Sequence, residues 1–134
     1  MYEEKLEEVR KFFSKDRYAT ENGAVIDEIG DNYAKCSLDI DGRHLNAMGS
    51  LMGGATFTLA DFTFAVASNW QNPGTVSLNS NITFLGVPKG KRLISQAECV
   101  KDGRSTCYYL VKITDELGTL VAETAITGYK TGKK

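Results

Sequence analysis

The stretch between Gly53 and Ser68 constrains the fold more than any other part of the chain. It is apolar on nearly every face of a helix and contains one ionisable residue, Asp61. A helix that is apolar all round has to be buried. At about 1.5 Å per residue it is also too short to cross a bilayer, which takes roughly 20 residues. We therefore predict a buried central helix over about residues 53–68.

Strand patterns fill most of the remaining sequence. Two apolar segments flank the turn at residues 30–32, and four more follow the Asn72-Pro73-Gly74 break. The six predicted strands span residues 24–29, 33–40, 76–85, 92–100, 105–114 and 119–129. In the third strand, strict alternation predicts that Val76, Leu78, Ile82 and Phe84 share one face and that Ser77, Asn79, Asn81 and Thr83 share the other.

An amphipathic pattern precedes the first strand and predicts a surface helix over about residues 2–14. The predicted order is helix, two strands, the long apolar helix, and four strands in a meander. The economical packing is an α+β fold in which one antiparallel sheet wraps around the central helix. A chain of 134 residues fits a single domain over residues 1–134.

Composition excludes several classes of function. The net charge is −1, with 16 Lys+Arg against 17 Asp+Glu, so no strong field favours nucleic acid or an anionic membrane. Cys36, Cys99 and Cys107 lack metal-ligand spacing, and one histidine with scattered thiols does not build a metal centre. The charged start MYEEK is unlike a secretory signal. We expect a cytoplasmic protein with reduced thiols.

Asp61 is the first candidate for a catalytic residue. Phe57, Thr58, Phe64 and Ala65 stand three and four residues from it, so its own helix offers no cation to pair with it. An unpaired carboxylate in apolar surroundings costs several kcal/mol or has its pKa raised. A raised pKa suits a general base near neutral pH. The alternative is an aspartate that caps a loop or meets an arginine from elsewhere.

Gly53 and Gly54 open the same helix. The first amides of a helix have no intrahelical acceptor, and without side chains a carbonyl oxygen can approach them, as in an oxyanion hole. Close packing of helix on sheet is the alternative. Asp61 lies about 12 Å further along the helix axis, too far to serve a carbonyl held at its own helix start. We therefore predict an active site shared between two chains of a dimer.

Residues 44–54 and 59–61 carry a family resemblance. They read HLNAMGSLMGG and LAD, and they resemble the pattern HxNxxGxxHGG followed by LxD of the PaaI-type hotdog-fold acyl-CoA thioesterases. Residues 76–85 and the segment DELGTLVAE also look like that family, and the likeness covers nearly the whole chain from Val25 onward. The resemblance implies a hotdog fold and a homo-oligomer, a dimer or a dimer of dimers.

The resemblance also implies roles for four residues. Asp61 matches the carboxylate that acts as nucleophile or general base on the thioester. Gly53 matches the oxyanion donor, Asn46 the residue that orients water or the thioester, and Ser77 a residue that assists water. Coenzyme A enters as part of the substrate, so no separate cofactor is implied.

Met52 departs from the family pattern, which has histidine before the glycine pair. A thioether is a weak acceptor and cannot donate, so activity or substrate range should change. A weakly active or non-catalytic acyl-CoA-binding protein is therefore an alternative. An acyl-CoA hydratase or dehydratase is less favoured, because no suitable histidine lies near the helix of Asp61.

Further residues are expected around the substrate. Four basic residues could meet the phosphates of coenzyme A: Lys89, Lys91, Arg92 and Arg104. The alternative is that they are solvent-exposed loop residues without a ligand. His44 is either a structural hydrogen-bonding residue or a ligand. Residues expected beside the thioester or acyl group are Met52, Gly54 and Asn81, with Phe57, Phe62 and Phe64 serving the acyl pocket or the core.

Overall fold

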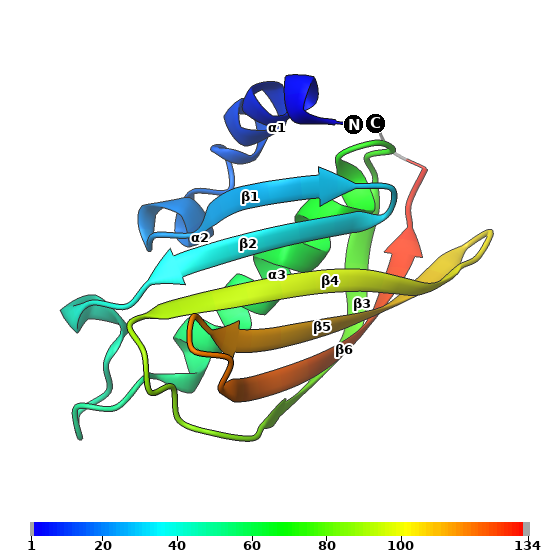
Figure 1. The fold of residues 1–134 in the computed structure, drawn as a ribbon. Helices are drawn as coiled ribbons and strands as arrows, with labels where there is room; N and C mark the ends of the chain where they lie inside the picture. Colours follow the sequence, from blue (N-terminus) through cyan, green and yellow to red (C-terminus); the bar gives the residue numbers. More distant parts are fainter. Residues whose placement is uncertain (1, 133–134) are drawn as a thin grey trace.

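The computed structural model describes residues 2–132, and one six-stranded antiparallel sheet dominates it (Figure 1). The strand order is β1-β2-β4-β5-β6-β3, and every neighbouring pair is antiparallel. The strands are β1 (Val25–Gly30), β2 (Tyr33–Asp39), β3 (Thr75–Phe84), β4 (Arg92–Asp102), β5 (Thr106–Asp115) and β6 (Leu120–Lys130). This is the α+β hotdog arrangement expected from the sequence.

The sheet wraps around α3 (Gly53–Asn69), which crosses its inner face diagonally (Figure 1). Leu59, Ala60 and Val66 are fully buried against the strands. Each Leu or Val buried in this way contributes about 1.5–3 kcal/mol. The central helix is confirmed and extends one residue beyond its predicted end. Within residues 2–132 no helix combines the length and the apolar character needed to cross a membrane.

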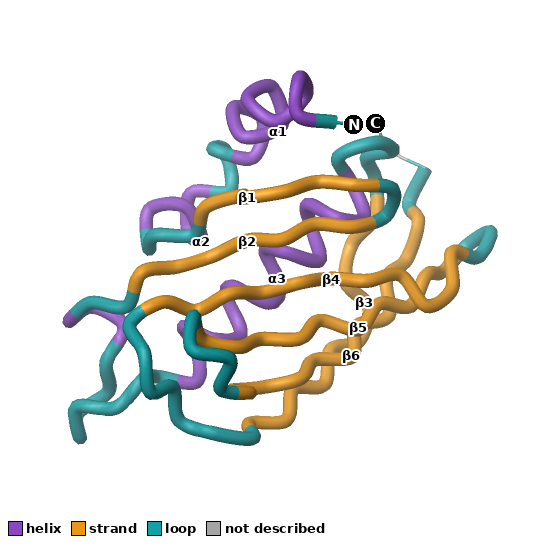
Figure 2. Tube along the Cα trace, viewed as in Figure 1, coloured by secondary structure: helices purple, strands orange, loops and turns teal. Residues whose placement is uncertain are grey.

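The N-terminal helix is also confirmed, although its first turn, η1 (Glu3–Lys5), is a 3₁₀ turn that leads into α1 (Leu6–Phe13). α1 lies beside β1 at the sheet edge (Figure 2). Val9 and Phe13 form its buried face, and the ring of Phe13 meets that of Phe62 edge to face, with centroids 6.3 Å apart.

The predicted four-strand meander is wrong for β3. Only β4, β5 and β6 form a meander, whereas β3 pairs with β6 at the far edge of the sheet. The connection over residues 85–91 therefore runs past the ends of β5 and β6 before β4 begins (Figure 1). β3 has one free edge as a result.

A β-bulge corrects the predicted faces of β3. Ser77 pairs with Gly128 and Asn79 with Thr127, so Leu78 has no partner of its own. A bulge residue shifts the alternation by one position. The side of β3 that faces α3 therefore carries Ser77, Ile82 and Phe84, whereas strict alternation had placed Val76 there.

Candidate active site

A tight loop leads into the N-terminus of α3. The Met52 amide donates to the His44 carbonyl at 2.8 Å, and the Asn46 amide donates to Ser50 at 2.7 Å. The side-chain oxygen of Asn46 accepts from the amides of Met48 and Ser50, at 2.9 and 3.1 Å. No partner engages the side-chain nitrogen of Asn46 within residues 2–132. That amide group remains a donor for a ligand near the helix start.

The first two amides of α3 are also without acceptors in the described part of the chain. They carry the positive end of the helix dipole. A Cβ on Gly53 would lie 2.9 Å from Cζ of Phe84, whereas a Cβ on Gly54 would meet only Cγ of Met52, at 4.0 Å. Close packing thus explains why residue 53 is glycine, and the free amides leave the oxyanion role open to the same residue.

Asp61 is half-buried on α3 and forms no hydrogen bond or ion pair with any residue from 2 to 132. It faces a hollow of about 490 Å³. Burial raises the pKa of its carboxyl group, and the negative charge of Asp16 raises this pKa further. The expected isolation of the carboxylate is confirmed within the chain. Arg17 also lines the hollow, but its guanidinium pairs with Glu21.

Part of this hollow was not foreseen from the sequence. Its far wall comes from α2 (Arg17–Glu21) and the residue before it, whereas the near wall comes from α3. The full lining is Asp16, Arg17, Tyr18, Ala19, Phe57, Thr58, Asp61, Phe62 and Ala65. A five-residue helix is too short to give a periodic signal, so the sequence pattern did not identify Asp16 or Tyr18 as site residues.

β3 places on opposite faces two residues that had been predicted to share one face. Ser77 is exposed on the side of the strand that faces α3. Asn81 pairs with Ala125 and faces away from the helix, into a separate groove with Gln96 and Lys112. The bulge at Leu78 shifts the alternation by one residue and so places Ser77 and Asn81 on opposite faces of β3. Within one chain Asn81 therefore does not share a hollow with Asp61, and its contact with substrate stays a prediction.

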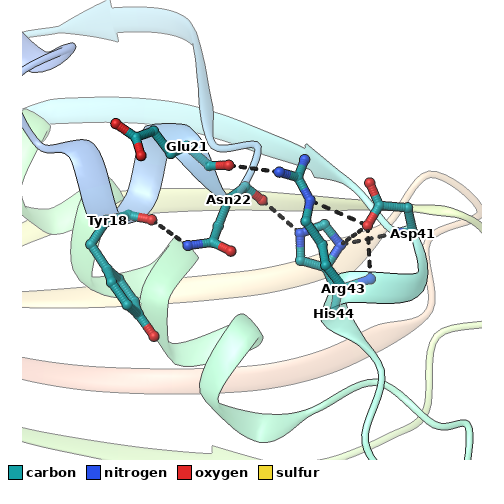
Figure 3. A network of polar contacts seen from close by, with 6 residues as sticks. All are labelled: Tyr18, Glu21, Asn22, Asp41, Arg43 and His44. Carbon is teal, nitrogen blue, oxygen red and sulfur yellow. Dashed lines mark hydrogen bonds and ion pairs between the residues drawn. The ribbon is translucent and has the colours of Figure 1, made fainter.

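His44 belongs to the fold. Its exposed fraction is 2%, its Nδ1 accepts from the Asp41 amide at 3.0 Å, and its Nε2 donates to the Asn22 carbonyl at 2.6 Å. Figure 3 shows both contacts: the first lies within the 3₁₀ turn η2 (Gly42–His44) and its N-cap Asp41, and the second joins η2 to the residue after α2. Both ring nitrogens are used within the chain, which favours the structural interpretation of His44 over a contact with substrate.

The four basic residues do not form one cluster. Arg92 is occupied, since its guanidinium bonds Ser37 Oγ at 2.8 Å and lies 3.6 Å from Asp27. Arg104 lies in the hairpin at the other end of β4, about 30 Å along the strand. Arg92 and Arg104 thus lie apart within one chain, and their contact with coenzyme A phosphates stays a prediction.

Lys89 and Lys91 remain exposed on a loop that carboxylates hold in place. The buried Asp115 accepts from the amides of Lys89 and Gly90, at 2.7 and 2.9 Å, while Glu116 accepts from that of Lys91. Burial alone would raise the pKa of Asp115, but these backbone donors outweigh it and lower the pKa well below the usual range. The loop is thus fixed with both lysine side chains in solvent.

Comparison with known proteins agrees with the fold. The family model of the thioesterase superfamily matches residues 48–122. A putative esterase of Archaeoglobus fulgidus is 32% identical over 80% of this chain and 70% of its own length. The acyl-coenzyme A thioesterase PaaI of Escherichia coli is 29% identical over 82% of this chain and 79% of its own.

Solved structures extend the likeness to nearly the whole chain. A hypothetical thioesterase of Streptococcus pneumoniae, crystallised with coenzyme A, superposes with a TM-score of 0.83 at 26% identity, covering 91% of this chain and 98% of its own. A Streptococcus mutans protein bound to acetyl-CoA has a TM-score of 0.76 at 29% identity, covering 84% and 91%. This chain belongs to the thioesterase superfamily and is a PaaI-type hotdog thioesterase.

Proposed function

We propose that the protein hydrolyses an acyl-CoA thioester to a free acid and coenzyme A at a site shared by two subunits. The observation that carries the proposal is the half-buried Asp61 carboxylate, which has no partner in the described chain and faces a hollow. Two structural relatives were crystallised with coenzyme A or acetyl-CoA. Their ligands support an acyl-CoA substrate here.

The chemistry assigns one task to each group. Asp61 either removes a proton from the attacking water or attacks the thioester carbonyl itself, and its raised pKa makes the carboxylate a stronger base. The amide of Gly53 donates to the oxygen that becomes negative in the tetrahedral intermediate. When Asp61 acts as base, the carbon–sulfur bond then breaks and the coenzyme A thiolate takes up the proton that Asp61 removed from water. When Asp61 attacks, breaking that bond leaves an anhydride between Asp61 and the acyl group; water then hydrolyses the anhydride to the free acid, regenerates the carboxylate and supplies the proton of the thiol.

The separation between Asp61 and Gly53 supports a shared site. They lie about 12 Å apart along the α3 axis, so one substrate carbonyl cannot meet both in the same chain. β3 offers the means of association, because within residues 2–132 its outer edge pairs with no strand, and its Val76, Leu78 and Phe84 side chains are exposed. An unpaired, apolar edge strand is suited to pairing with a second copy.

Two further residues have positions that suit supporting roles. The free amide group of Asn46 lies in the loop before the glycine pair and can orient the thioester or water. Ser77, on the helix-facing side of β3, can hold water near an Asp61 carboxylate. The exposed side chains of Lys89 and Lys91 can meet coenzyme A phosphates, since their loop is fixed through its backbone.

The decisive test compares three variants in a thiol-release assay over several acyl-CoAs. Asp61→Asn removes the base. Gly53→Pro removes the amide donor yet fits the helix, because proline is favoured at the first helical position and Met52 already has the extended backbone required before proline. Gly53→Ala adds a Cβ and keeps the donor. We expect the rate of thiol release to fall about 10²-fold or more in Asp61→Asn and in Gly53→Pro. It should fall much less in Gly53→Ala.

Asp39→Asn is the matched control for the charge change, because Asp39 is an exposed carboxylate at the end of β2. Equal turnover in wild type and Asp61→Asn would refute the mechanism. Saturable binding of acyl-CoA without thiol release in the wild type would establish the alternative of a binding protein. Hydration of crotonyl-CoA without thiol release would establish a hydratase.

A further inference from the structure

We infer that α2 forms a specificity-determining wall of the Asp61 pocket, and that the ring of Tyr18 limits the length of the acyl group. This inference rests on the proposed thioesterase function and extends it to acyl selectivity. Tyr18 lines the same hollow as Asp61, although no part of the family-like motif at residues 44–61 includes it.

The wall has the composition of an acyl pocket. Tyr18 and Ala19 face Phe57, Phe62 and Ala65 across the hollow of about 490 Å³. Ligand pockets are mostly apolar and about 300–1,000 Å³ in volume. An acyl chain that starts at a thioester beside Asp61 would extend along these side chains, and Tyr18 stands at the rim because 77% of its surface is exposed.

α2 cannot hold Tyr18 in place by its own stability. Helices shorter than about 12 residues are marginal in water, and α2 has five residues. The carbonyl groups at its end have no intrahelical partners and need other donors. Three donors supply them: Asn22 Nδ2 to Tyr18, Arg43 Nη1 to Glu21 and His44 Nε2 to Asn22, each at 2.6 Å (Figure 3).

Through these contacts the buried His44 supports α2, the wall of the Asp61 hollow. Its ring joins η2 to the residue after α2, and Arg43 makes a second joint beside it. Residues distant in sequence thereby fix the backbone of α2, which carries Tyr18. The backbone of this wall is held in place beside the hollow, so the side chain at position 18 determines how far an acyl group can extend.

The test compares kcat/KM for butanoyl-CoA and dodecanoyl-CoA in wild type, Tyr18→Ala, Tyr18→Phe and Tyr108→Ala. Tyr108 is a matched control, because it is partly exposed on β5 and does not line the hollow. We expect Tyr18→Ala to raise the dodecanoyl-to-butanoyl ratio about tenfold or more, the size of effect that a few methylene contacts produce. Tyr18→Phe and Tyr108→Ala should leave the ratio unchanged.

The inference is overturned if Tyr18→Ala leaves the ratio unchanged, lowers both values equally, or is matched by Tyr18→Phe. Affinities for the corresponding non-hydrolysable thioether analogues, measured by calorimetry, give the same ratio without catalysis. A wild type that releases no thiol but shows the Tyr18-dependent affinity ratio would defeat the proposed function and keep the wall. A wild type that releases thiol, together with a Tyr18→Ala variant whose ratio is unchanged, would keep the proposed function and defeat the wall.

Discussion

Asp61 shows how much a single residue can reveal before a structure exists. Its apolar helical neighbours predict an isolated carboxylate, and the structure confirms that isolation within residues 2–132. The neighbouring Asp16 could not be foreseen, because its proximity depends on a turn between α1 and α2. Both carboxylates line one hollow, and burial raises the pKa of Asp16 as well.

This pair of carboxylates predicts a pH dependence. Asp61 has to be ionised to act, so activity falls as pH decreases through its pKa. Because burial and then Asp16 raise that pKa, the fall should occur at higher pH than for an ordinary aspartate, whose pKa is about 3.9. Asp16→Asn removes one negative charge, lowers the pKa of Asp61 and moves the acidic limb of the kcat/KM profile to lower pH.

Asp16→Asn should move the acidic limb only part of the way, because burial is the larger cause of the raised Asp61 pKa and is still present in the variant. Glu123→Gln, on the other face of the sheet, serves as the control and should leave the profile in place. An acidic limb that is identical in wild type and Asp16→Asn would show that the two carboxylates do not interact in the working enzyme.

At the scale of elements, long patterns were predictable and short irregularities were not. The 17-residue α3 and all six strands follow from periodicity. The bulge at Leu78 and the five-residue α2 do not, because each depends on tertiary partners. The bulge matters most for the site, since it places Ser77 and Asn81 on opposite faces. The position of β3 beside β6 likewise depends on long-range pairing that the order of strands cannot reveal.

The contact that His44 makes between η2 and the end of α2 predicts a loss of stability when His44 is replaced. His44→Ala leaves the Asp41 amide and the Asn22 carbonyl without their partners. Both hydrogen bonds are partly buried, and each contributes about 0.5–1.5 kcal/mol. We therefore expect the free energy of unfolding to fall by about 1–3 kcal/mol in urea denaturation. Arg104→Ala, in an exposed hairpin, should leave it nearly unchanged. Equal stability of wild type and His44→Ala would contradict the anchoring of α2.

At the scale of the whole molecule, the sequence predicts that one chain is insufficient. The distance from Gly53 to Asp61 follows from helix geometry alone, and the structure adds the free, apolar edge of β3 as a means of association. The acyl group could not be predicted from the sequence, because the hollow beside Asp61 takes part of its shape from α2 and, under our proposal, another part from a second subunit. Neither leaves a periodic trace in the chain.

A mixing experiment measures this sharing directly. Asp61→Asn and Gly53→Pro are each expected to be nearly inactive as homodimers. After unfolding and refolding together in equal amounts, about half of the dimers should contain one chain of each kind, and each of these has one of its two sites intact. Thiol release should recover to roughly a quarter of the wild-type rate. No recovery, in a sample whose mixed dimers are verified by native mass spectrometry, would contradict a site built from the carboxylate of one subunit and the glycine amides of the other.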